Sequence, residues 1–74
     1  MQISDLKARA LAAGDDLERM FDVVEDVVRW KDASANQRQV ALAASRSLQV
    51  LRISATETRV QVARIRYAKL VALL

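Results

Sequence analysis

Residues 37–74 read QRQVALAASRSLQVLRISATETRVQVARIRYAKLVALL, and their spacing predicts one long, basic helix. From Ala41 onward, apolar and small residues recur in alternating steps of three and four, which places them on one stripe of a helix. The members of this first stripe are Ala41, Ala44, Leu48, Leu51, Ala55, Thr58, Val62, Ile65, Lys69 and Ala72. Because the stripe keeps its phase, we expect a continuous helix that makes its main contact through this face.

The beginning of the chain carries a matching stripe, formed by Ile3, Leu6, Ala10, Ala13, Leu17, Met20, Val24 and Val27. If the chain folds back near Ser34, position i faces position 68 minus i, and every residue of one stripe meets a residue of the other. The pairs are Ile3 with Ile65, Leu6 with Val62, Ala10 with Thr58, Ala13 with Ala55, Leu17 with Leu51, Met20 with Leu48, Val24 with Ala44, and Val27 with Ala41. Local and long-range patterns then agree, as they should in a sequence that specifies one structure.

The sequence therefore predicts an all-α, antiparallel two-helix hairpin of the coiled-coil type. It forms a single domain over residues 1–74, with a first helix over 3–32, a turn over 33–36 and a second helix over 37–73. Ser4 is the expected N-cap of the first helix, and Ser34 and Asn36 are candidate caps of the second. Short connections of this kind join antiparallel neighbours in helical bundles.

Two stretches carry signals for a helix break. Gly14 is followed by Asp15-Asp16-Leu17-Glu18, which resembles a capping box, and Ser54-Ala55-Thr56-Glu57 offers a second one. One interpretation is close packing of two continuous helices through small residues, since the stripe passes Gly14 in phase and a glycine inside a helix costs only about 1 kcal/mol. The alternative is a break or a shared kink at both places.

A second stripe on the long helix lies roughly 150° from the first. Its members are Ile53, Thr56, Val60, Ala63, Tyr67, Leu70 and Leu74. A helix with two apolar faces must be covered on both, and a chain of 74 residues buries little surface alone. We expect a homodimer that forms a four-helix bundle, or a different protein bound at this face. The predicted interface residues are Ile53, Val60, Ala63, Tyr67, Leu70 and Leu74.

Charge is divided unevenly along the chain. Residues 1–32 hold five basic and eight acidic side chains, whereas residues 33–74 hold seven basic side chains and a single acidic one, Glu57. The candidate face for an anionic partner consists of Arg38, Arg52, Arg59, Arg64, Arg66 and Lys69. Inside the hairpin, Arg52 is expected to reach Glu18 or to stack on Phe21. Such a face favours an acidic protein partner, or RNA or DNA bound through phosphates.

The composition disfavours catalysis. The chain has no histidine and no cysteine, which leaves no thiolate ligand or cysteine nucleophile, and its carboxylates fall mostly on outward rows of the first helix. We therefore expect no enzymatic activity, no metal and no cofactor. No apolar run approaches the roughly 20 residues of a membrane span, and no signal peptide is evident, so we expect a cytoplasmic protein. Peripheral membrane binding is less favoured, because the first stripe is needed for the core.

These patterns favour a small, non-catalytic protein–protein interaction module. Adaptors, chaperones, assembly factors and inhibitors of bacterial or phage origin are similar in size and build. The alternative is a dimeric hairpin that binds RNA or DNA, similar in architecture to the RNA-binding hairpins of plasmid control. The run Leu51-Arg52-Ile53-Ser54 also resembles the turn of helix-turn-helix proteins, although Arg52 stands where a glycine is common.

Overall fold

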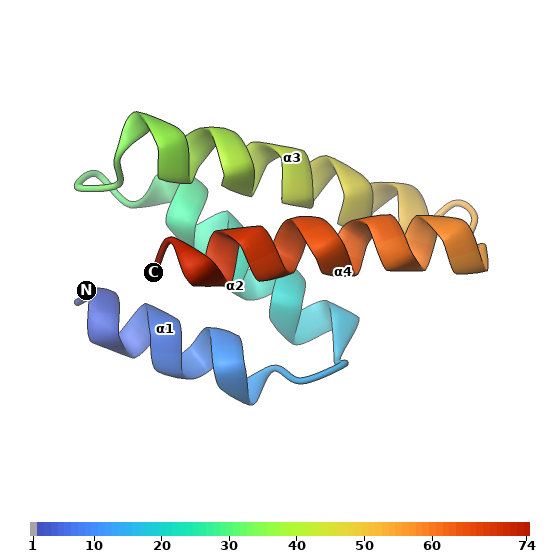
Figure 1. The fold of residues 1–74 in the computed structure, drawn as a ribbon, viewed down its shortest axis with the longest axis horizontal. Helices are drawn as coiled ribbons and strands as arrows, with labels where there is room; N and C mark the ends of the chain where they lie inside the picture. Colours follow the sequence, from blue (N-terminus) through green and yellow to red (C-terminus); the bar gives the residue numbers. More distant parts are fainter. Residues whose placement is uncertain (1) are drawn as a thin grey trace.

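Four α-helices make up the computed structural model, which describes residues 2–74 and contains no strand in that range (Figure 1). They are α1 (Ile3–Ala12), α2 (Leu17–Arg29), α3 (Ala35–Leu51) and α4 (Glu57–Ala72). In Figure 1, α1 and α3 flank α4 on opposite sides, and α2 crosses behind α4. The radius of gyration is 11.4 Å, close to the value of about 11 Å for a compact domain of this length. The prediction of an all-α protein is confirmed.

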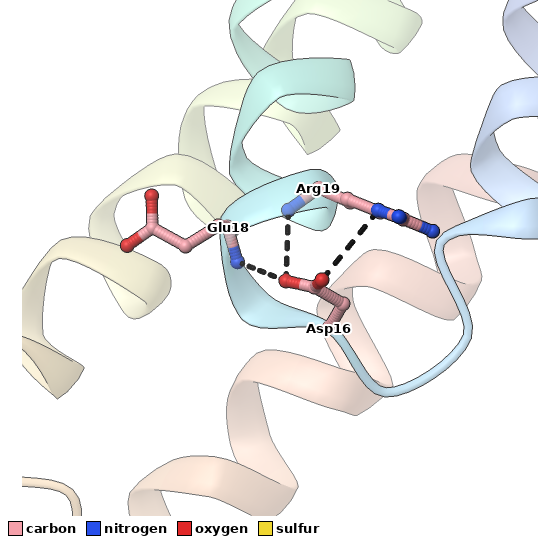
Figure 2. Close-up of polar contacts among 3 residues, drawn as sticks. All are labelled: Asp16, Glu18 and Arg19. Carbon is pink, nitrogen blue, oxygen red and sulfur yellow. Dashed lines mark hydrogen bonds and ion pairs between the residues drawn. The ribbon is translucent and has the colours of Figure 1, made fainter.

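The predicted first helix is divided at Gly14, which adopts a left-handed conformation with φ of 55°. Glycine enters this region without the steric cost that other residues incur. Beyond it, the carboxylate of Asp16 caps α2 by accepting hydrogen bonds from the amides of Glu18 and Arg19, at 3.0 and 3.3 Å (Figure 2). One continuous helix over 3–32 was therefore the wrong prediction, and the cap of α2 is Asp16, the second residue of the stretch that resembles a capping box.

The predicted second helix is divided as well, since α3 ends at Leu51 and α4 begins at Glu57. The hydroxyl of Thr56 accepts from the amide of Arg59 at 3.3 Å and caps α4. Ile53 and Ser54 have lower helix propensity than the residues on either side of them, and Glu57 carries negative charge at the positive end of the α4 dipole. The continuous helix over 37–73 was also wrong, and at both places the break is confirmed against close packing.

The central connection covers residues 30–34, earlier than the predicted turn over 33–36, because α2 ends at Arg29 and α3 begins at Ala35. The hydroxyl of Ser34 accepts from the Gln37 amide at 3.0 Å, while Oε1 of Gln37 accepts from the Ser34 amide at 2.8 Å, so the two form a capping box. Asn36 lies inside α3 and Ser4 inside α1, whose N-cap, Gln2, makes no side-chain cap hydrogen bond. Of the predicted caps, Ser34 is the one confirmed.

The pairing of α2 with α3 keeps the predicted stripes. Met20, Val24 and Val27 of α2 are buried, as are Ala41, Ala44, Leu48 and Leu51 of α3. Leu17 and Leu51 line the same small hollow, and the guanidinium of Arg52 lies 4.7 Å from the centroid of the Phe21 ring. The stacking of Arg52 on Phe21 is one of its two predicted contacts.

The pairing of α1 with α4 departs from the predicted register. Tyr67 Oη donates a hydrogen bond of 2.8 Å to the Ala10 carbonyl, nine residues beyond Thr58, the predicted partner of Ala10. Ile3 and Ile65, which were predicted to pack on each other, are both exposed. The reason is the break at residues 52–56, because α4 turns back along α3 instead of extending it.

Contacts at both ends of α3 and α4 show that these helices run antiparallel. Near the chain end, the Gln37 side-chain amide donates to the Leu73 carbonyl at 2.9 Å. Further along, Arg66 Nη1 donates to Ser47 Oγ at 2.7 Å. The two helices of a helix-turn-helix motif cross at about 90–120°, so this arrangement does not follow the resemblance seen around Leu51.

Candidate functional site

The second stripe lies largely inside the folded chain. Ala63, Tyr67 and Leu70 are buried in the core, while Val60 and Leu74 are partly buried against it. Ile53 is exposed in the connection between α3 and α4. The prediction that this stripe is free on the surface was wrong for the three buried residues, because α4 uses it to pack against α1 and the core. Homodimer formation stays a prediction, but these three side chains are not accessible to a partner in this fold.

The outer face of α4 consists instead of residues that were predicted to point inward. Thr58, Val62, Ile65, Lys69 and Ala72 all belong to the first stripe, and all are exposed. The break at 52–56 resets the helical phase, so the first stripe is buried on α3 and turned outward on α4. Two aliphatic side chains, Val62 and Ile65, therefore face solvent.

Two hollows lie between α3 and α4. The first, of about 180 Å³, is lined by Ser47, Val50, Thr58, Arg59 and Val62. The second, of about 240 Å³, is lined by Gln39, Val40, Ala43, Arg66 and Lys69. The hydrogen bond from Arg66 to Ser47 joins the residues of the two hollows, and we call the ten lining residues together the α3–α4 groove.

Aliphatic side chains that are partly open to solvent form part of the wall of the groove. Val50 of α3 and Val62 of α4 line the same hollow and are 39% and 38% exposed. Val40 and Ala43 extend the apolar wall along the second hollow, and both are partly buried. The groove therefore offers apolar surface to a partner without any change in the fold.

Positive charge surrounds this apolar wall. Arg59 and Lys69 form no ion pair within residues 2–74, and Arg66 bonds to the uncharged Ser47. No acidic side chain lines either hollow. Glu57, the one acidic residue after position 32, lies roughly 140° from Val62 around the α4 wheel. The positive charge of the groove is therefore uncompensated within the described chain.

The predicted arginine face is divided by the fold. Arg38 donates to the carbonyls of Trp30 and Lys31, at 3.0 Å each, and Arg52 stacks on Phe21. Arg64 approaches Asp15 at 3.7 Å on the side of α4 away from the groove. The groove brings together three of the six predicted residues, Arg59, Arg66 and Lys69.

Sequence reasoning missed Val50 and placed Val62 and Ile65 on the wrong face. It also left Arg46, which is exposed on α3, out of the candidate face for an anionic partner. Both apolar faces of α4 were recognised in the sequence, as parts of the first and second stripes, but Val62 and Ile65 were assigned to the core. Only the break signals at Ser54 and Thr56 indicated that α4 should be considered separately from α3.

Outside the α3–α4 groove, the described chain offers weaker candidates for a functional site. A hollow of about 250 Å³ between α1 and α2 is lined by Arg9, Ala12, Ala13, Arg19, Asp22 and Val23. Residues 2–74 contain no group of three or more His, Cys, Asp or Glu side chains that could hold a metal ion. None of the helices described is both long and apolar enough to span a membrane.

One buried titratable group is perturbed. Burial raises the pKa of the Tyr67 hydroxyl, and the nearby positive charge of Arg9 acts in the opposite direction with a smaller effect. This hydroxyl donates a hydrogen bond to the Ala10 carbonyl. The packing of α1 on α4 therefore uses the protonated form of Tyr67.

The fold and the site together define a compact all-α bundle with a basic, partly apolar groove on the α3–α4 pair. Comparison of the chain with models of known protein families, with curated proteins and with solved structures returns no match.

Proposed function

We propose that this protein is a non-catalytic protein-binding module and that its binding surface is the α3–α4 groove. The observation that carries the proposal is the pairing of exposed Val50 and Val62 across one hollow, with uncompensated positive charge beside them. Burying such aliphatic surface releases about 25 cal/mol per Å², and the charges would orient an approaching partner. A module of this kind acts as an adaptor, assembly factor or inhibitor, through surface complementarity.

Site-specific photo-crosslinking tests the proposal. A photoreactive amino acid at Val62 should give discrete crosslinked products in cells of the source organism, and Val50→Asp should abolish them. The matched control carries the same amino acid at Leu11, which is exposed on α1, on the opposite side of α4 from α3 (Figure 1). Identical products from both positions, or none from Val62, would refute the proposal.

Nucleic-acid binding is the second candidate, supported by the excess of seven basic over one acidic side chain in residues 33–74. Binding through phosphates should weaken steeply as salt increases, because counterions are released. Titration of the protein with labelled single-stranded RNA and duplex DNA at two salt concentrations tests this candidate. An absence of binding at the lower concentration would eliminate it.

A further inference from the structure

We infer that the occupant of the α3–α4 groove is an acidic amphipathic helix of a different protein. This inference rests on the proposed function and adds the chemistry of the partner. Two features of the groove carry it, its shape between two antiparallel helices and its distribution of charge.

The shape suits a third helix. α3 and α4 have 17 and 16 residues, which corresponds to a groove roughly 25 Å long. Such a groove between paired helices accepts an amphipathic helix whose apolar residues recur at i, i+3 or i+4, and i+7. The hollow between Val50 and Val62 takes an aliphatic side chain of that helix, and the hollow beside Ala43 takes one from about two turns further along it.

The positive charge of the groove specifies which residues should flank the apolar stripe of the partner helix. Arg59 and Arg66 are seven residues apart on α4, about 10.5 Å along the helix axis, and Lys69 continues the same edge. Arg46 is exposed on α3. A partner helix with Asp or Glu one heptad apart beside its apolar stripe would place carboxylates opposite Arg59 and Arg66. A basic helix would meet repulsion at the same positions.

The same observations disfavour the other occupants. A second copy that applied its own α3–α4 groove would bring Arg59, Arg66 and Lys69 against their like-charged counterparts. RNA would place sugar and phosphate over the exposed Val50 and Val62, and no aromatic side chain lines the groove for base stacking.

The probe for this inference is a synthetic, fluorescein-labelled helical peptide of about three heptads, with Leu at positions a and d and Glu at e and g. Its charge-reversed counterpart has Lys in place of Glu, and like charges oppose self-association of both peptides. Fluorescence anisotropy with the full chain should show binding of the Glu peptide and much weaker binding of the Lys peptide. Amide shifts in NMR spectra should be concentrated around Val50 and Val62.

Substitutions of surface cations that form no ion pair test whether the positive charge of the groove contributes to binding. Arg59→Glu combined with Lys69→Glu should weaken binding of the Glu peptide about tenfold. The matched control, Lys7→Glu with Lys31→Glu, makes the same change in net charge on exposed residues outside the groove and should stay within about twofold. Circular dichroism should show that all variants fold, because none of these four side chains forms an ion pair within residues 2–74.

Four results would overturn the inference. They are equal binding of the two peptides, equal effects of the groove and control variants, displacement of the Glu peptide by single-stranded RNA, and self-association of the protein that Val62→Asp abolishes. The two proposals fail separately. If the Glu peptide does not bind but crosslinking at Val62 still captures a protein, the acidic-helix inference is wrong and the proposed function stands. If both experiments are negative, both proposals are wrong.

Discussion

The hydroxyl of Tyr67 ties α1 to α4, and the variant Tyr67→Phe removes it without changing the ring. Tyr67 Oη donates to the Ala10 carbonyl at 2.8 Å in a buried position. Ala10 belongs to the last turn of α1, where carbonyls lack a donor within the helix. A buried carbonyl left without a donor costs about 1–3 kcal/mol. We expect Tyr67→Phe to lower the free energy of unfolding by about 1–2 kcal/mol, which is several degrees in Tm for a domain of this size.

Urea denaturation and hydrogen exchange measure this effect. The unfolding midpoint should fall with an unchanged m-value, because the surface exposed on unfolding is the same. Amides of α1 should exchange faster than those of α3, because Leu6 and Ala10 are the only buried residues of α1 and the hydroxyl is one of its few fixed contacts with α4. A change of less than about 0.3 kcal/mol, or equal acceleration in α1 and α3, would refute this reasoning.

The Tyr67 hydroxyl also makes the free energy of unfolding depend on pH in the alkaline range. Burial raises the pKa of Tyr67 in the folded chain above its ordinary value of about 10, with Arg9 opposing the rise. Above that ordinary value the unfolded chain loses the proton first, so this contribution is complete below pH 10 and is lost as pH rises toward the folded pKa. The difference in stability between the parent and Tyr67→Phe should therefore be the same at about pH 8 and about pH 9 and should narrow above about pH 10. A difference that stays constant up to about pH 11 would contradict the assignment.

Three further predictions, which involve five substitutions, test the breaks and the assignment of faces. Gly14→Ala should lower the free energy of unfolding by about 1–2 kcal/mol through its left-handed φ alone, since no atom lies within 4 Å of the added Cβ; an unchanged Tm would contradict this. Asp16→Ala should cost about 1 kcal/mol in urea denaturation and Asp16→Asn much less, because asparagine also caps; equal losses would exclude the capping explanation. Val24→Ala, at a fully buried position, should cost about 2 kcal/mol and Val62→Ala much less, and the reverse order would place Val62 in the core.

Some of this structure follows from the sequence because the signals are local. The alternation of three and four residues predicted helices throughout, and Ser34 was one of the two residues expected to cap the helix after the central connection. Arg52 was expected near Phe21 from the helical positions of both residues, and the structure places it there. These inferences depend on residues within one helix or on two helices joined by the short central connection.

The two breaks could not be decided in the same way. Keeping Gly14 in a helix costs only about 1 kcal/mol, and a helix end capped by Asp16 recovers a similar amount. Two nearly equal local energies leave the choice to tertiary packing, in this case burial of Tyr67 and Leu70 in the core, where Tyr67 also bonds to Ala10 of α1. A stripe rich in alanine also does little to fix which face of a helix is buried, because small side chains gain little free energy from burial on either face.

The groove was missed for a related reason. α4 has apolar residues on two sides, and the sequence does not indicate which side is inward. Val62 and Ile65 were assigned to the core because they continue the phase of α3. Because α4 turns back along α3, Val62 and Ile65 lie on the surface instead. The groove is formed by the two helices together and corresponds to no linear sequence motif.

The division of charge found in the sequence follows the helices of the folded chain. Seven of the nine carboxylate side chains lie in residues 15–32, on α2 and the turns beside it, and seven of the twelve basic side chains lie in residues 33–74, on α3, α4 and their connection. A molecule with such an uneven distribution of charge rotates as it nears a charged surface and arrives with a preferred side forward. We therefore expect a negatively charged surface to meet the side of the protein that carries α4 first.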